Sequence, residues 1–560
     1  MKQYSKDDIL TVRITDMDDA GCGIGKDEDG FTLFVKDAVV GDTVKVKIMK
    51  AKKNFAFARL SEVIEPSPER VIPPCPNARA CGGCQLQALD YAAQLRFKAG
   101  KVRNNLMRIG GFDEEFLDTV FEEPIGMEEP FGYRNKAQYP VGRDRKTGEI
   151  IAGFYAGRTH DIVPCLSCML GPSEYEGILR AIIGHMNAKA IEPYSETTGK
   201  GLVRHILIRK GFRTGEIMVC LIVNAKSSDK RVVSVFDGLG KVLGIHSLSL
   251  NFNDRNTNVI MGDETVCIFG SPVIHDSING VMFEISPRSF YQVNPIQVER
   301  LYGKAVEYAA LSGDETVWDL YCGIGTISLS MAGSASKVYG VEVVPEAIED
   351  ARKNAVANGI SNAEFMVGKA EEVLPEFYRD KAADGMCHPD VIVVDPPRKG
   401  CDEVCLDTML RMSPSRIVYV SCDSATLARD LKILSDGGYR IEKVCPVDMF
   451  PQTVHVETVV LLSQLRHKPD DYIDVDVDVA ELTGTSAETK ATYEKIKKYV
   501  AEHNDGMKVS SLNIAQVKAK YGIIERENFN KPKSEEAKQP QCPKENEEAI
   551  MEALKAFQMI

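Results

Sequence analysis

The first stretch of the chain alternates apolar and polar residues with a period of two. This pattern predicts half-buried β-strands, at residues 10–14, 32–35, 43–48 and 55–60. The glycines of residues 21–25 fall between the first two strands and predict a turn. Short strands joined by turns predict a small OB-like β-barrel over residues 1–64.

The pattern changes twice further along the chain. Prolines at positions 66, 68, 73 and 74 mark a linker, a helical period covers residues 88–110, and strand patterns run from Phe131 to about residue 285. These features predict a mixed, β-rich central domain over residues 65–286. Its 88–115 segment is expected to be able to pack on the domain that follows. From residue 287 to 466, strands alternate with helices, which predicts a doubly wound α/β domain with a parallel sheet.

Three predicted strands of this α/β domain end in a residue that can do chemistry: Glu342, Asp395 and Cys422. In open α/β sheets, ligands bind outside the carboxyl ends of the strands, so these side chains are expected to share one site. A cysteine placed there can act as a nucleophile. The same position also suits a small buried packing thiol, because most free cysteines serve that purpose.

A glycine turn lies just before the first of these strands. The sequence Asp319-Leu-Tyr-Cys-Gly-Ile-Gly325 runs into a helix, and Glu342 ends the next strand, where a carboxylate can accept both ribose hydroxyls of an adenosine. A dinucleotide site would have a third glycine for the pyrophosphate. Here Thr326 follows Gly325, which favours S-adenosylmethionine as the ligand.

A cysteine-rich segment follows the linker. Cys75, Cys81 and Cys84 are spaced as Cys-x₅-Cys-Gly-Gly-Cys, and the two glycines allow the backbone to fold round a metal. A fourth thiolate is available downstream, at Cys165 or Cys168. The spacing alone does not separate a Cys₄ zinc site from an iron–sulfur cubane, since both are thiolate cages.

Composition and charge narrow the class of protein. The net charge of −13 over 560 residues argues against general coating of nucleic acid, although a local basic face is compatible with it. Residues 45–59 contain six basic residues, no acidic residue, and Phe55 and Phe57, which suits a surface that tracks phosphates and stacks bases. A solvated edge strand guarded by lysines would look the same.

No signal peptide or run of eighteen apolar residues occurs, so a cytoplasmic protein without a membrane partner is expected. A monomer is also expected. In a reducing compartment, the fifteen cysteines indicate thiol chemistry or metal binding rather than disulfides.

An ordered set of motifs resembles the RNA uracil-5-methyltransferases. The N-terminal barrel resembles a TRAM domain, and with the cysteine run the chain is most similar to the iron–sulfur branch that acts on 23S ribosomal RNA. The resemblance covers roughly residues 8–466 and implies S-adenosylmethionine, a [4Fe-4S] cluster and a class I methyltransferase domain. The motifs that carry it are Phe290-Tyr-Gln-Val-Asn294, Asp319-Leu-Tyr-Cys-Gly-Ile-Gly325, Asp395-Pro-Pro-Arg-Lys-Gly400, Ser421-Cys-Asp-Ser-Ala-Thr-Leu-Ala-Arg-Asp430 and His455-Val-Glu457.

The resemblance implies a role for each site residue. Cys422 is expected to add to uracil C6, which makes C5 nucleophilic enough to take a methyl group, and Glu457 to remove the C5 proton afterwards. Four residues are implied to hold S-adenosylmethionine: Glu342 at the ribose, Tyr321 near the adenosine, and Asp395 and Gln292 at the amino-acid end. Any of the four can instead be a structural polar group.

Two features depend on the details of the motifs. Asp423-Ser424 stands where the family usually has Asn-Pro; its carboxylate would disfavour the Cys422 thiolate unless it is paired, or it could accept from uracil N3–H. In the family, the fourth cluster ligand follows a His-x-Ile-Val segment. Counting on from His160-Asp-Ile-Val163 places it at Cys168 rather than Cys165.

Residues 467–560 lie outside the resemblance. Residues 468–478 alternate acids with valine and suit a linker or an edge strand, and three amphipathic helices are expected over 487–503, 511–521 and 545–557, as in a small helical or winged-helix module. Its lysines at 495, 497, 498, 518 and 520 could contact RNA or simply face solvent.

Two other functions are compatible with the whole sequence: a tRNA uracil-5-methyltransferase and a non-catalytic RNA-binding protein whose fold is stabilised by a metal. A cytosine-5-methyltransferase is disfavoured because no Pro-Cys dipeptide follows the Asp395 strand.

Overall fold

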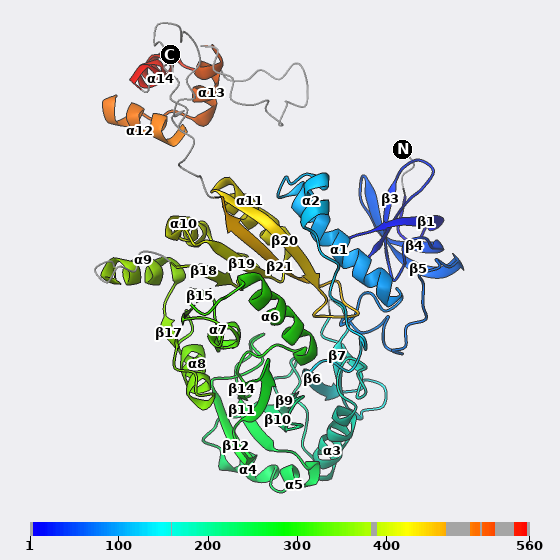
Figure 1. The fold of residues 1–560 in the computed structure, drawn as a ribbon. Coiled ribbons are helices and arrows are strands. Elements are labelled where there is room, and N and C mark those ends of the chain that lie inside the picture. The colour runs from blue at the N-terminus through cyan, green and yellow to red at the C-terminus, as the bar shows by residue number, and fades with distance from the viewer. Residues whose placement is uncertain are drawn as a thin grey trace. The chain divides into compact units, whose positions relative to one another are not determined.

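A computed structural model describes residues 4–157, 159–381, 389–465, 493–504, 507–520 and 542–556. The chain divides into two compact units, Met1–His467 and Lys468–Ile560 (Figure 1). The first unit holds a barrel and two large sheets. The predicted boundaries at residues 65 and 287 inside this unit stay predictions.

The N-terminal strands close into a barrel in the order β1-β2-β3-β5-β4. Alternate residues, among them Val12, Leu33 and Val46, point inward and fill its core, so the period-two pattern predicted this element correctly. The predicted glycine turn is wrong in part, because Gly23 and Gly25 lie inside a strand. A Cβ at Gly25 would meet the Arg13 carbonyl oxygen at 2.6 Å, so close pairing of β1 with β2 requires glycine there. The strands are β1 (Ile9–Met17), β2 (Gly23–Lys26), β3 (Thr32–Lys36), β4 (Thr43–Ala51) and β5 (Phe55–Glu65).

The central sheet has seven strands in the order β12-β11-β10-β9-β6-β7-β8, and helices α3, α4 and α5 pack on one face of it. A hairpin of β13 and β14 connects it to the next domain and packs against that domain's core. The elements are β6 (Lys136–Arg143), β7 (Ile150–Tyr155), β8 (Ile162–Pro164), α3 (Glu174–Ala188), β9 (Val203–Lys210), β10 (Ile217–Val223), α4 (Lys230–Val235), α5 (Leu239–Leu243), β11 (Ser247–Phe252), β12 (Glu264–Gly270), β13 (Ile274–Ile278) and β14 (Val281–Ile285).

The third sheet confirms the doubly wound prediction. Its order is β17-β16-β15-β18-β19-β21-β20; the first five strands are parallel, and β21 runs antiparallel to both of its neighbours. The elements are α6 (Pro295–Ala309), β15 (Thr316–Leu320), α7 (Thr326–Ala332), β16 (Lys337–Glu342), α8 (Pro345–Ala357), β17 (Ala363–Val367), α9 (Ala370–Lys381), β18 (Val391–Val394), α10 (Glu403–Met412), β19 (Arg416–Ser421), α11 (Ser424–Asp436), β20 (Tyr439–Val447) and β21 (Glu457–Gln464).

Helices cover both faces of this sheet. Helices α6, α7 and α8 share one apolar core with it, and α9, α10 and α11 share the core on the other face. Two helices from before the central sheet, α1 (Tyr91–Arg108) and α2 (Glu114–Val120), join that second core through Val102, Leu106 and Leu117. The 88–115 segment therefore packs on the α/β domain, and Asn105 Nδ2 donates to Ser424 Oγ at 2.8 Å.

The second unit is helical in the part that the structure describes. Its helices α12 (Tyr493–His503), α13 (Ser511–Lys520) and α14 (Lys544–Ala556) bury Ile496, Val500 and Ile550 in a common core. The predicted 468–478 linker or edge strand lies outside the described residues. Lys518 is only 2% exposed, so the idea that it faces solvent or RNA is wrong. Lys498 and Lys520 pair with Glu502 and Glu547.

Across the residues that the structure describes, no helix combines the length and the apolar character needed to cross a membrane.

Candidate active site

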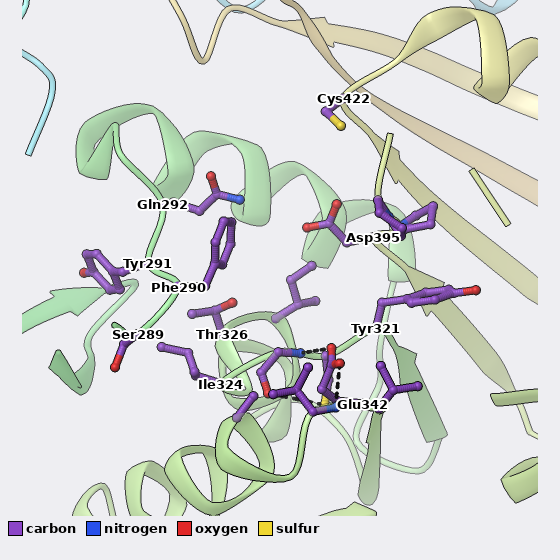
Figure 2. A pocket seen from close by; sticks show the side chains of 18 of the residues that line it. Ser289, Phe290, Tyr291, Gln292, Tyr321, Ile324, Thr326, Glu342, Asp395 and Cys422 are labelled. Atoms are coloured by element: carbon purple, nitrogen blue, oxygen red, sulfur yellow. Dashed lines mark hydrogen bonds between the residues drawn. The ribbon is translucent and has the colours of Figure 1, made fainter. Parts of the chain in front are cut away.

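A cavity of about 1420 Å³ opens at the carboxyl ends of the parallel strands, where β15, β16, β18 and β19 end. All six predicted catalytic and cofactor-binding residues line it: Gln292, Tyr321, Glu342, Asp395, Cys422 and Glu457. In Figure 2, Gln292, Thr326 and Asp395 surround a common space, and Cys422 lies beyond Asp395 on the side away from Glu342. The cavity therefore has two ends with different chemistry.

The first end is built on backbone geometry. Glu342 ends β16, and its carboxylate accepts the amide of Gly323 at 3.3 Å and the amide of Val344 at 3.0 Å, as the dashed lines of Figure 2 show. Tyr321 has a φ of +66°, which is rare for a residue with a side chain and turns the chain sharply at the strand end. The carboxylate is thus fixed at the rim of the cavity, where it suits a ribose.

Asp319 stabilises this end of the cavity without lining it. It is fully buried, and Ser328 Oγ of α7 donates to one of its carboxylate oxygens at 2.5 Å. Burial raises the pKa of Asp319 to about 7. Asp319 does not line the cavity, so its contact with α7 holds the glycine turn in place.

Tyr302 was not predicted from the sequence. Its buried hydroxyl accepts from Gln292 Nε2 at 3.3 Å and from Thr326 Oγ1 at 3.5 Å, so it ties two cavity-lining side chains together. In the sequence, Tyr302 is one more apolar-face residue of an amphipathic helix. Only the packing of α6 beside the glycine turn gives it a place in the site.

The other end of the cavity gathers a thiol and two carboxyls. Cys422 follows β19, Asp395 follows β18, and Glu457 begins β21 with 5% of its surface exposed. Burial and then Asp395 raise the pKa of Glu457 to about 8, while burial, Glu457 and Asp395 raise the pKa of Cys422 to about 12. The positive charge of Arg398 lowers both pKa values, so Arg398 is the group that favours the ionised nucleophile and base.

This electrostatic arrangement predicts a rate that rises with pH. Below pH 8, each unit of pH increases the fraction of both Cys422 thiolate and Glu457 carboxylate, because both pKa values are raised. Arg398→Met should move the alkaline-rising limb of the kcat/KM profile upward by about 0.5 to 1 pH unit, a reduced shift because Arg398 is exposed to solvent. Lys432→Met, at an exposed position of α11 that pairs with Asp436 and does not line the cavity, is the control. An unmoved limb in Arg398→Met would contradict the assignment.

Asp423 has a structural partner. Its carboxylate Oδ1 accepts the amides of Ala425 at 3.0 Å and Thr426 at 3.1 Å, which makes it the N-cap of α11. The negative charge therefore lies at the positive end of a helix dipole, which is the pairing that the Asp423-Ser424 departure required. An Asp423 contact with uracil N3–H stays a prediction.

Replacement of this cap should separate stability from chemistry. Asp423→Ala removes both hydrogen bonds and should lower the free energy of unfolding by about 1 kcal/mol, whereas Asp423→Asn keeps an acceptor and should change it by only a few tenths. Urea unfolding at constant pH measures both. Equal losses in the two variants would show that capping does not explain this aspartate.

The predicted metal ligands share one neighbourhood. The thiols of Cys81 and Cys84 interact electrostatically with Cys75 and Cys168, and Asn77 Nδ2 donates to the Pro164 carbonyl at 3.1 Å, which ties the two cysteine-bearing segments together. Among the described residues, no three His, Cys, Asp or Glu side chains are arranged to hold a metal ion. A cubane differs from a single-ion site because each of its thiolates binds a separate iron, so the four sulfurs need not converge on one point.

The barrel carries the predicted basic and aromatic face on β4 and β5. Phe57 is 42% exposed, and its ring centroid lies 5.6 Å from those of Phe34 and Phe55. Lys47 pairs with Asp7 at 2.9 Å. An exposed aromatic ring can stack on a base, and the lysines beside it can bind the phosphate.

The fold and the cavity define a methyltransferase domain joined to an RNA-binding barrel, and comparisons with known proteins agree. Residues 217–465 match the family model described as tRNA (Uracil-5-)-methyltransferase, and residues 8–61 match the TRAM domain. The chain belongs to this family of S-adenosylmethionine-dependent RNA uracil-5-methyltransferases.

Relatives that match over almost their whole length support the assignment. An "Uncharacterized RNA methyltransferase" of Bacillus cereus is 46% identical over 82% of this chain and 98% of its own length, and one of Clostridium acetobutylicum is 47% identical over the same shares. The crystal structure of the Pyrococcus abyssi tRNA (uracil-54, C5)-methyltransferase with S-adenosyl-L-homocysteine is 27% identical, with a TM-score of 0.64, and covers 81% of this chain and 99% of that one.

Proposed function

We propose that the protein methylates C5 of a uridine in 23S ribosomal RNA, with Cys422 as nucleophile and Glu457 as general base. The observation that carries the mechanism is that a thiol from β19 and a buried carboxyl from β21 line the same cavity as the predicted cofactor ligands. Bound S-adenosylmethionine supplies an electrophilic methyl group and a positive sulfonium. Such a charge near Asp395 would favour the Cys422 thiolate further.

The reaction balances through a covalent RNA adduct. The Cys422 thiolate forms a bond to uracil C6, and the displaced electron pair of the C5–C6 double bond forms the bond from C5 to the methyl group, whose bond to the sulfonium sulfur would break to leave S-adenosylhomocysteine. Glu457 then removes the C5 proton, the double bond re-forms, and the C6–sulfur bond breaks to release the thiolate. Gln292, Tyr321, Glu342 and Asp395 hold the cofactor in this proposal, with Glu342 at the ribose.

The second candidate substrate is tRNA. It is favoured by the family description and by the printed name of the Pyrococcus abyssi enzyme, which acts on a tRNA uracil. Ribosomal RNA is favoured by the cysteine segment at residues 75–84 together with the barrel, the combination on which the resemblance to the 23S branch depends.

Mapping 5-methyluridine in ribosomal RNA and tRNA from cells with and without the gene decides between the two. Loss of a 5-methyluridine from 23S RNA, restored by the purified enzyme on the extracted RNA, supports the proposal. Loss from tRNA alone would reassign the substrate, and no change in either RNA would favour a non-catalytic role.

We also propose a [4Fe-4S] cluster on Cys75, Cys81, Cys84 and Cys168. The cluster would have a structural role, because it would bind the segment of Cys75, Cys81 and Cys84 to the segment of Cys168. Cys84 and Cys168 pack against one apolar cluster of Met127, Tyr133 and Leu170. Cys165 is more deeply buried, with 7% exposed, and lies outside that cluster, which supports Cys168 as the fourth ligand.

The ligand set predicts different iron contents for two neighbouring variants. Cys168→Ser should lose most of its iron and brown absorbance after anaerobic purification, because a missing thiolate destabilises a metal site that is coupled to local folding. Cys165→Ser is the matched control and should keep its iron. The reverse result would move the ligand to Cys165, and full iron in both would exclude either residue as an essential ligand.

A further inference from the structure

The proposed general base is delivered by a loop with an unusual conformation. Residues 448–456 join β20 to β21 and place His455 and Glu457 at the cavity. In the middle of this loop, Gln452 has a φ of +71°, a left-handed conformation that costs free energy in a residue with a side chain. Such a conformation persists only where surrounding contacts hold it.

Helix α1 holds the first part of the loop through a buried ion pair. Lys98 Nζ lies 2.5 Å from Asp448 Oδ1 and also donates to the Phe450 carbonyl at 3.0 Å. Tyr91 Oη donates to the other oxygen of Asp448 at 3.0 Å. Lys98 and Asp448 are each 1% exposed, so water cannot replace either partner without opening the interface.

The strained residue itself is held from both sides. Gln94 Nε2 donates to Gln452 Oε1, and the Gln452 amide donates back to Gln94 Oε1, each at 3.0 Å. The amides of Gln85 and Leu86 both donate to the Gln452 carbonyl at 3.0 Å. All four hydrogen bonds come from outside the α/β domain, and two of them come from the residues directly after Cys84.

A further contact comes from the apolar cluster beside the cysteines. Tyr133 is fully buried in that cluster, and its hydroxyl donates to the Pro451 carbonyl at 3.0 Å. Asn294, the N-cap of α6, adds a bond to the Met449 carbonyl at 3.0 Å from within the α/β domain. The loop is thus fixed along most of its length before the chain reaches His455.

We propose that α1, Tyr133 and the Gln85–Leu86 amides form a clamp that positions Glu457 for removal of the C5 proton. Gln94, Lys98 and Tyr133 are then positioning residues, which act on the reaction only through the loop. The inference rests on the proposed function, because it assumes that Glu457 is the base. It assigns to the cysteine-bearing segment a direct mechanical connection to the active site.

The clamp predicts a defect in one step of the reaction. Cys422 follows β19, which pairs with β18 as well as with β21 and makes none of the clamp contacts, so addition to C6 and methyl transfer should continue when the clamp is weakened. Proton removal should slow. The methylated RNA should therefore accumulate as a covalent adduct, whereas general destabilisation would reduce all steps together.

A matched pair of tyrosines provides the cleanest test. Tyr133→Phe removes the hydroxyl that bonds the Pro451 carbonyl, and Tyr439→Phe removes a buried hydroxyl that bonds the Pro414 carbonyl, at 2.7 Å, away from the loop. With cluster-loaded enzyme and RNA extracted from cells that lack the gene, Tyr133→Phe should lower kcat about 3- to 10-fold and leave KM for S-adenosylmethionine nearly unchanged. Tyr439→Phe should match the wild type. Equal kcat values in the two variants overturn the clamp.

A stronger variant gives a second readout. Gln94→Leu should lower kcat by about 10- to 100-fold and accumulate a denaturant-resistant RNA adduct, whereas Arg96→Gln, an exposed position on the same helix, should do neither. Slow turnover without adduct in Gln94→Leu overturns the proposal.

Hydrogen exchange tests the clamp independently of which residue acts as the base. Amides of residues 448–456 should exchange faster in Gln94→Leu than in Arg96→Gln, whatever residue removes the proton, and equal exchange overturns the clamp. Normal turnover in Glu457→Gln would instead reject the base assignment in the proposed function and leave this exchange result to decide the clamp.

Discussion

Cys422→Ala is expected to abolish methylation and to leave the affinity for S-adenosylmethionine nearly unchanged. The loss should exceed about 10⁴-fold in kcat, because without a thiolate at C6 the C5 position of uracil is too weak a nucleophile. The thiol lies at the end of the cavity away from Glu342, so its removal takes no contact from the proposed ribose site. Methyl transfer from labelled cofactor and equilibrium binding of the cofactor measure the two effects.

Cys445→Ala is the matched control for this variant. Cys445 is a buried cysteine on β20 that does not line the cavity, so its loss removes a similar volume without touching the reaction. It should lose stability by packing alone and keep its methyl transfer. Methylation at the wild-type rate in Cys422→Ala would reject the covalent mechanism.

The convergence of the site residues could be predicted because strand ends are readable in sequence. Glu342, Asp395 and Cys422 each come at the end of an apolar run, and the parallel order of a doubly wound sheet brings such positions to one edge. The barrel was readable for a similar reason, since its period-two pattern is long and regular. In both cases a local pattern determines a tertiary position.

Other features depend on packing between segments far apart in the chain. Tyr302 and the contact of Gln94 with Gln452 have no periodic signal, because each is defined by a partner that the fold supplies. Lys518 shows the opposite failure: a charged residue in an amphipathic pattern indicated an exposed face, yet the side chain is buried. Hydrophobic periodicity therefore does not predict the burial of polar side chains whose polar atoms are hydrogen-bonded inside the protein.

The sequence predicted that carboxyl groups lie near Cys422, but it did not predict how far their pKa values are shifted. Burial raises the pKa of Asp395 to about 7, and burial together with the charge of Asp395 raises the pKa of Glu457 to about 8. A group that titrates there can hold a proton at neutral pH and release it readily. This is the range in which a general base is most effective.

Glu457→Gln is expected to methylate its RNA once and then stall. The amide has nearly the size of the carboxyl but cannot take the C5 proton, so the enzyme should remain bonded to methylated RNA through Cys422. The adduct should appear as a gel-shifted band that survives denaturant and carries label from the cofactor methyl group, while multiple turnover falls by at least about 10²-fold. Glu442→Gln, on the adjacent strand β20 where Glu442 accepts from Ser463 Oγ at 2.5 Å, is the control and should turn over normally.

His455 also lines the cavity, and burial lowers its pKa, so it is a neutral competitor for the role of base. If His455→Gln accumulates the adduct and Glu457→Gln turns over normally, the base is His455 and the Glu457 assignment is wrong.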